Sequence, residues 1–336
     1  MKGFTKYFIQ KLLWYALAFF IALFLNFFLP RLIPGDPISV IVGRVMSGNV
    51  ASETQERIYQ SYVHEFGLDK PIIVQFFTYI GNIFKGNLGT SFSLYPLSVN
   101  EVIGSAVVWT IALQLPSILV GWIIGNLLGA ATAYRNGVFD KTIFPLSLFV
   151  SSIPYQCLAI ILLYFFGVNL GWFPIGGGYS RTLLPSLSWT FILDVLHHYF
   201  LPFISLVLVT IGGQAIGMRE MSIYELNTDY VTYCKMLGMK DKKIQKYVFK
   251  NAVLPQITGL AISLGSMVGG ALVTEIVFGY PGLGTWLFNG IRQLDYPLIQ
   301  GSTLIIALMV LLANFIMDMV YGLIDPRIKA AQMEEV

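Results

Sequence analysis

The chain has 336 residues, of which 56% are hydrophobic and only 12% carry charge. A soluble globular protein has about twice that fraction of charged residues, so the apolar surplus indicates a protein that faces lipid. The net charge of +3 is too small to indicate nucleic-acid binding, and two cysteines exclude a disulfide framework. The composition therefore predicts an integral membrane protein.

Long windows without Asp, Glu, Lys or Arg locate the membrane spans, because a helix needs about 20 apolar residues to cross the hydrocarbon core. Six windows reach this length; five or seven spans are the alternatives. The first span ends near residue 30, and the others are predicted at about 106–133, 143–167, 199–218, 253–275 and 300–323. We therefore expect an all-α integral membrane protein with about six transmembrane helices. Its parts are a first segment over 1–30, an extracytoplasmic insertion over 31–101 and a five-helix core over 102–336.

The basic residues predict the orientation of these spans. Lys2, Lys6 and Lys11 precede the first span, and a lysine cluster lies between the fourth and fifth spans. Both regions fall on one side of a six-span arrangement, and the positive-inside rule makes that side cytoplasmic. Both termini are then expected in the cytoplasm. No small-residue cleavage site follows the first span, which favours an uncleaved anchor over a signal peptide.

The 31–101 insertion begins with turn residues, Pro34-Gly35-Asp36-Pro37. A short polar helix is predicted over 53–66, and an aromatic amphipathic segment over Ile72–Phe84. The insertion is either a cap packed on the outer membrane face or a docking surface for a partner that delivers substrate. The sequence does not separate these two hypotheses.

The loop over 219–250 is too charged to lie in lipid. Within it, an N-cap at Asn227-Thr228-Asp229 and a stop at Gly238 predict a short helix. Its apolar positions follow the helical period and are expected to form one face: Tyr230, Val231, Tyr233, Cys234 and Leu237. That face would rest on the lipid surface or insert into a groove of a partner protein, and both alternatives remain open.

Several kinds of chemistry are missing from the sequence. It has no phosphate-binding GxxxxGK[ST] loop, no HExxH, no GxSxG and no Cys/His cluster, so we expect no ATPase motif, no metal and no cofactor bound by this chain. Glu275 and Asp318 lie near span ends, where a helix-end acid is commoner than a proton relay. An ion-coupled secondary transporter is therefore the alternative function rather than the preferred one.

Glycines spaced by four residues predict close helix packing. They include Gly121, Gly125 and Gly129 in the second span and Gly213 and Gly217 in the fourth. The fifth span has a similar set, and we treat it as a candidate pathway or gate helix whose residues are Gly265, Ser266, Gly269, Gly270 and Glu275.

The order and spacing of short motifs give the chain a family resemblance. The motifs are Pro34-Gly35-Asp36-Pro37, Phe66-Gly67-Leu68-Asp69-Lys70-Pro71, Gly86-Asn87-Leu88-Gly89-Thr90-Ser91, Asp229-Tyr230-Val231 leading to Gly238, Asn251-Ala252-Val253-Leu254-Pro255, Gly269-Gly270, Thr274-Glu275, Tyr280-Pro281-Gly282-Leu283-Gly284 and Asp325-Pro326-Arg327-Ile328. Over nearly its whole length the chain resembles the membrane permeases of binding-protein-dependent ABC importers of the dipeptide, oligopeptide and nickel group.

The resemblance implies a type I importer fold and a set of partners. Two permeases, usually different chains, form the pathway; two ATPase subunits that bind ATP and Mg attach in the cytoplasm, and an extracytoplasmic solute-binding protein delivers cargo. The cargo would be peptides or oligosaccharides, and the location a cell inner membrane.

The resemblance also implies a role for the 219–250 loop. In the family this loop bears the "EAA" coupling helix, which seats in a cleft of the ATPase. The corresponding residues are Asp229, Tyr230, Val231, Thr232, Tyr233, Cys234, Leu237 and Gly238. The chain departs from the signature at Thr232, Tyr233 and Cys234, which stand where the family has Glu-Ala-Ala.

Overall fold

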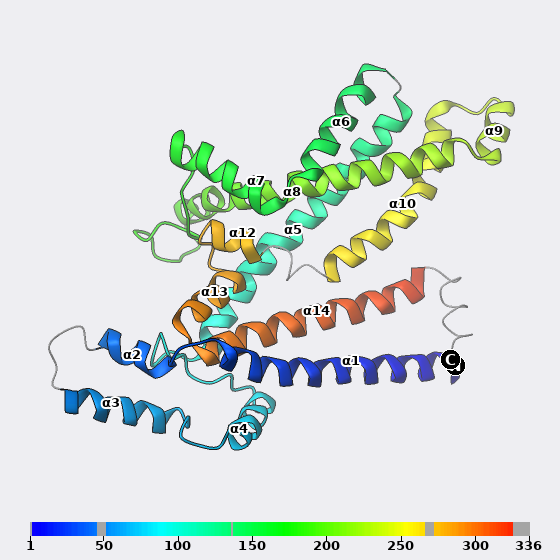
Figure 1. Cartoon of the computed structure of the whole chain (residues 1–336). Coiled ribbons are helices and arrows are strands. Elements are labelled where there is room, and N and C mark those ends of the chain that lie inside the picture. The colour runs from blue at the N-terminus through cyan, green and yellow to red at the C-terminus, as the bar shows by residue number, and fades with distance from the viewer. Residues whose placement is uncertain (1, 46–51, 136, 266–271, 325–336) are drawn as a thin grey trace. The chain divides into compact units, whose positions relative to one another are not determined.

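The computed structural model describes residues 2–45, 52–135, 137–265 and 272–324. Within these ranges the named elements are all helices (Figure 1). In chain order they are α1 (Lys2–Phe28), η1 (Leu29–Leu32), α2 (Pro37–Val45), α3 (Ser52–Glu65), α4 (Ile72–Phe84), α5 (Val99–Tyr134), α6 (Val138–Ser152), α7 (Tyr155–Leu162), η2 (Leu163–Asn169), α8 (Trp189–Leu226), α9 (Asp229–Met236), α10 (Asp241–Gly265), α12 (Leu272–Val277), α13 (Leu283–Gln293) and α14 (Tyr296–Ile324).

Four described segments are long and apolar enough to cross a membrane: Phe8–Leu32, Val99–Tyr134, Trp189–Leu226 and Tyr296–Ile316. A fifth span results if the bent pair Val138–Ser152 and Tyr155–Asn169 is counted as one. Large apolar side chains on these helices, such as Leu13 and Phe20, are exposed, as lipid contact requires. The prediction of an all-α membrane protein is confirmed. The predicted span over 253–275 includes residues 266–271, which lie outside the described residues.

The region of the predicted span over 143–167 is bent by 96° between α6 and α7 in the structure. Ile153 at the break has an extended backbone, with φ −83° and ψ 122°, and Pro154 follows it. Proline has no N–H for the helix ladder and disfavours the helical conformation in the residue before it. The break thus comes from Pro154.

The fourth span is longer than the predicted 199–218, since α8 already begins at Trp189. The first turns of α8 therefore include a charged residue, Asp194, ahead of the predicted span. In the structure its carboxylate accepts hydrogen bonds from the backbone N–H of Ser180 at 2.6 Å and from the Ser180 hydroxyl at 2.7 Å. These bonds satisfy the acid inside the first turns of the helix.

The chain forms two compact units. One contains Met1–Trp109 and Pro281–Phe315, and the other contains Thr110–Tyr280. The 31–101 insertion is part of the first unit: Ile38, Val42 and Phe92 are buried in one cluster with Tyr296 and Ile299 of α14.

In the second unit, α5 crosses α8 at very short range along its predicted glycines. A Cβ atom built on Gly121 would lie 2.6 Å from the side chain of Thr210, and one on Gly125 would lie 2.8 Å from the carbonyl oxygen of Ile211. Gly129 faces the backbone of Ala215 in the same way. The predicted packing role is therefore confirmed for this row.

The prediction for Gly213 is wrong. A Cβ at Gly213 would meet nothing within 4 Å, whereas its neighbour Gly212 packs on the backbone oxygen of Ser147 in α6, 2.8 Å from its virtual Cβ. The spacing of four residues from Gly217 predicted a close helix contact at Gly213, but the contact is made by the preceding residue, Gly212. Gly217 itself packs against the side chain of Gln256.

Candidate functional site

Helix α9 lies over the residues where the sequence predicts a short cytoplasmic helix, beside the ends of α8 and α10 (Figure 1). It begins after Thr228, whose backbone is extended, and has Asp229 in its first turn and Lys235 in its last. Both charges suit the helix dipole. The Thr228 hydroxyl donates to the carbonyl oxygen of Glu225 at 2.6 Å, so the cap is not made by the side chain.

Gly238 ends α9 by adopting a left-handed backbone, with φ +66°. Its N–H donates to the carbonyl oxygen of Lys235 at 3.0 Å, and the N–H of Met239 donates to that of Cys234 at 3.2 Å. These two bonds are the Schellman pattern, which favours glycine because a side chain costs energy at positive φ.

One face of α9 packs on the same chain. Val231 is fully buried with Ile244 and Val248 in the first turns of α10, and Tyr230 and Cys234 lie against this cluster. The helix is therefore fastened to the start of α10, which continues toward the predicted fifth span.

The opposite face of α9 is apolar and exposed. Tyr233 is 63% exposed, Met236 79% and Leu237 61%, whereas Val231 is 0% exposed. The prediction that one face is formed by Tyr230, Val231, Tyr233, Cys234 and Leu237 is therefore wrong. Helix α10 covers Tyr230, Val231 and Cys234, whereas Tyr233 and Leu237 remain exposed. Met236 was missed, although it follows Tyr233 at the helical i+3 spacing. Asp229 and Thr232 are also exposed.

A polar cluster fixes the start of α9. The Tyr230 hydroxyl donates to Glu225 Oε2 at 2.7 Å and accepts from Asn251 Nδ2 at 3.2 Å, and the same amide donates to Glu225 Oε2 at 3.3 Å. Burial, and then the hydrogen bond to Glu225, raise the pKa of Tyr230, so its hydroxyl stays a neutral donor. The three side chains join α8, α9 and α10.

An ion pair joins α8 to α6. Arg219 makes two parallel hydrogen bonds to Asp140, from Nε to Oδ1 at 2.7 Å and from Nη2 to Oδ2 at 2.8 Å. Its guanidinium also lies 4.1 Å from the ring centroid of Phe144. Bidentate Arg–carboxylate pairs fix geometry as well as charge. Side chains thus join α9 to α8 and α10, and this ion pair joins α8 to α6.

The candidate gate residues are only partly described. Gly265 is the last residue of α10, and Ser266, Gly269 and Gly270 lie outside the described residues. Glu275 is fully buried in α12, where its carbonyl oxygen accepts a hydrogen bond from the N–H of Tyr280 at 2.8 Å. The gate role of these residues stays a prediction.

Among the described residues, no group of three or more His, Cys, Asp and Glu side chains has an arrangement that could hold a metal ion. His198 instead has its Nδ1 2.9 Å from the carbonyl oxygen of Asp194, and His197 has its Nε2 2.8 Å from that of Trp172. His198 thus contacts the backbone of α8, and His197 that of the segment after η2.

Two family models match the sequence. Residues 125–330 match the binding-protein-dependent transport system inner membrane component, and residues 4–117 match the N-terminal membrane component of such systems. The first match includes α9 and the described part of the candidate gate.

Curated relatives match over almost the full length. The di/tripeptide transport system permease protein DppB of Pseudomonas aeruginosa is 32% identical over 93% of this chain and 95% of its own. The oligopeptide transport system permease protein AppB of Bacillus subtilis is 32% identical over 91% and 93%. The glutathione transport system permease protein GsiC of Pectobacterium atrosepticum is 30% identical over 96% and 99%.

Proposed function

Since the chain belongs to the family of binding-protein-dependent transport system inner membrane components, as a permease subunit of an ABC importer, we propose that it forms half of a translocation pathway for short peptides. Peptides are favoured over oligosaccharides because the relatives are named for di- and tripeptides, oligopeptides and glutathione, which is itself a tripeptide. Import of labelled di- and tripeptides by the reconstituted complex tests the substrate. Import of an oligosaccharide that peptides do not inhibit would overturn it.

The complete importer would contain a second permease, two ATPase subunits and an extracytoplasmic solute-binding protein. ATP and Mg would be held by the ATPases, because the sequence of this chain has no phosphate-binding loop. Peptide uptake should therefore stop when ATP is omitted from the vesicle lumen. Uptake driven by a proton or sodium gradient without ATP would support the ion-coupled alternative.

We assign ATPase coupling to α9. The observation that carries this assignment is the exposed apolar face of the helix. We call this face the α9 outer face, and it consists of Tyr233, Met236 and Leu237. The same helix already buries Val231 against α10. A short helix that packs one face on its own chain and exposes an apolar face is suited to insert into a groove of another protein. Most exposed lysines of this loop, such as Lys240 and Lys243, follow Gly238 rather than lie on α9, which disfavours a helix held on lipid by its own basic face.

Charge placed on the α9 outer face tests the assignment. Tyr233→Asp and Met236→Asp should reduce both peptide import and cargo-stimulated ATPase activity by about tenfold or more, because an acid would have to be desolvated in the groove. The matched control is Tyr247→Asp on α10, an exposed tyrosine of the same loop outside α9, which should retain activity.

The same preparations separate docking from folding. The variants should insert and elute like the parent chain, while the ATPase subunits dissociate during purification in mild detergent. Parent-like import by Tyr233→Asp together with Met236→Asp would rule out α9 as the coupling element.

A further inference from the structure

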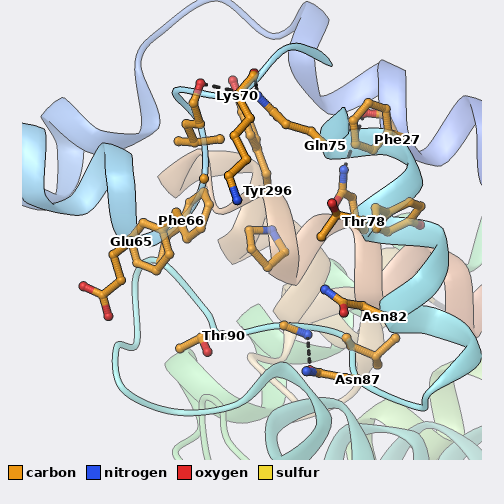
Figure 2. A pocket seen from close by; sticks show the side chains of 18 of the residues that line it. Phe27, Glu65, Phe66, Lys70, Gln75, Thr78, Asn82, Asn87, Thr90 and Tyr296 are labelled. Atoms are coloured by element: carbon orange, nitrogen blue, oxygen red, sulfur yellow. Dashed lines mark hydrogen bonds between the residues drawn. The ribbon is translucent and has the colours of Figure 1, made fainter. Parts of the chain in front are cut away.

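The first compact unit contains a polar hollow with a volume of about 350 Å³, shown in Figure 2. It lies among the end of α1, the segment between α3 and α4, the inner side of α4, the 87–92 loop and the first turn of α14. Small-molecule sites in proteins commonly have volumes of about 300–1,000 Å³. The hollow is thus at the small end of the ligand-binding range.

Two cations line this hollow, and neither has a carboxylate within ion-pair distance in the described part of the chain. Lys70 extends into the hollow in Figure 2. Arg31 donates only to neutral groups, from Nη1 to the carbonyl oxygen of Phe27 at 2.7 Å and from Nη2 to Gln75 Oε1 at 2.9 Å. Both charges therefore act on whatever occupies the hollow.

The acids and the histidine at the edge have other partners than these two cations. The Glu65 side chain points away from the hollow in Figure 2, and its Oε1 accepts a hydrogen bond from the Tyr95 hydroxyl at 2.8 Å. The His64 ring has its Nδ1 3.1 Å from Asp69 Oδ2, so those two groups satisfy one another. Lys70 and Arg31 therefore line the hollow without a carboxylate partner among the described residues, an arrangement that suits an anion.

The other walls are suited to a small peptide. Asn82 and Thr90 present an amide and a hydroxyl, and both are among the side chains drawn around the hollow in Figure 2. Phe66 and Phe92 lie with ring centroids 4.3 Å apart and form, with Tyr296, an aromatic wall. Amide groups pair with a peptide backbone, and aromatic rings accept an apolar side chain.

We propose that this hollow binds the carboxylate end of a short peptide. Lys70 holds the carboxylate, Arg31 adds positive potential, Asn82 and Thr90 hydrogen-bond the last peptide unit, and the aromatic wall receives the terminal side chain. The inference rests on the proposed function for its ligand class, since peptides are the proposed cargo. It assigns to this chain a peptide-binding site of its own, in addition to its part in the pathway.

The test uses the full chain with its second permease in phosphatidylcholine nanodiscs. The probe is the tripeptide Ala-Ala-Phe with a fluorophore on its amino end, and the matched probe has a C-terminal amide. Fluorescence anisotropy should give a Kd about tenfold or more higher for the amide, and a similar increase for the free acid on Lys70→Met, because both changes remove a charge-assisted hydrogen bond. Lys70→Arg should restore most of the affinity.

The control is Lys85→Met, which removes an exposed lysine of the same unit at the end of α4, outside the lining of the hollow; it should leave the Kd unchanged. Equal affinity for acid and amide, or an unchanged Kd for Lys70→Met, would overturn the proposal.

Two further outcomes would also overturn it. The first is competitive loss of probe binding when phosphatidylglycerol is added, which would assign the hollow to a lipid headgroup. The second is that the parent chain binds no peptide, while Lys70→Met binds the purified solute-binding protein more weakly than the parent does. This result would assign the hollow to an acidic side chain of that partner. Peptide import, measured separately in proteoliposomes, tests the proposed function. Absence of import would contradict the proposed function without changing the measured Kd values. Import would not support the binding site if the Kd measurements contradict it.

Discussion

At the scale of single residues, Asp295 fixes the first compact unit. Its side chain is fully buried, and Oδ2 accepts from the Ser91 hydroxyl at 2.5 Å and from the backbone N–H and hydroxyl of Ser93 at 2.8 and 2.7 Å. Oδ1 accepts from the N–H of Leu298 at 3.1 Å, which caps the start of α14. One carboxylate thus joins the segment before α5 to α14.

The substitution Asp295→Asn tests this role. The amide keeps the size but loses the charge and one acceptor, leaving the N–H of Ser93 or a serine hydroxyl without its partner, at a cost of about 1–3 kcal/mol. We expect a lower midpoint of thermal unfolding in detergent and faster proteolysis of the 85–98 segment. Glu101→Gln, an exposed acid in the same unit, is the control and should unfold like the parent. Equal midpoints for both variants would show that the buried carboxylate is not needed.

At the scale of elements, the close crossing of α5 and α8 predicts an asymmetric response to added methyl groups. Gly125→Ala places a Cβ 2.8 Å from the carbonyl oxygen of Ile211, so the helices must separate, at a cost of about 1–3 kcal/mol. Gly213→Ala meets open space and removes a poor helix former, so it should be neutral or stabilise by up to about 1 kcal/mol. Thermal unfolding of the two variants side by side measures the difference, and equal effects would contradict a close crossing at Gly125.

Element positions follow well from the sequence where the signal is local. The period of apolar residues and the glycine stop place α9 within a residue of its observed end, and charge-free windows find the long spans. The facing of side chains does not follow from these signals. Whether Val231 or Tyr233 turns inward depends on α10, which covers only one face of α9. The start of α8 ahead of the predicted 199–218 span likewise depends on a partner elsewhere in the chain, because Asp194 is bound by Ser180 of a separate loop.

Helix α4 carries a second element-scale prediction. Phe76 on its inner face contacts the rings of Phe24, Phe27 and Phe28 at the end of α1, while Ile73 and Phe77 on the opposite face are exposed. An uncharged helix with one exposed apolar face, attached to the end of a spanning helix, is suited to lie at the membrane surface. This favours the cap hypothesis for that part of the insertion.

Spin labels test the placement of α4. With Cys157 and Cys234 replaced by serine, a nitroxide at Ile73→Cys or Phe77→Cys should be more accessible to oxygen than to a water-soluble nickel complex, because oxygen concentrates in lipid. A label at Gln60→Cys on the exposed side of α3 should show the opposite preference. If the labels at all three positions were equally accessible to oxygen and to the nickel complex, α4 would lie in water. That result would favour the docking hypothesis for the insertion.

At the scale of the whole molecule, helix length and charge together predict which loops lie on which side of the membrane. Helix α8 has 38 residues, a length of about 57 Å at about 1.5 Å per residue, whereas the hydrocarbon core is about 30 Å thick. Its end therefore extends well beyond the core, and from the lysines that follow, the positive-inside rule predicts that this end and α9 lie in the cytoplasm. The 31–101 insertion is then expected on the opposite side of the membrane.

Cysteine labelling checks this arrangement in right-side-out vesicles. On a background with Cys157 and Cys234 replaced by serine, Gln60→Cys in α3 should react with a membrane-impermeant maleimide in intact vesicles. Met236→Cys, which is exposed on α9, should react only after the vesicles are permeabilised. Both positions are accessible in the folded chain, so a difference between them reports the side of the membrane rather than burial. Labelling of Met236→Cys from outside would invert the orientation and remove α9 from any contact with a cytoplasmic ATPase.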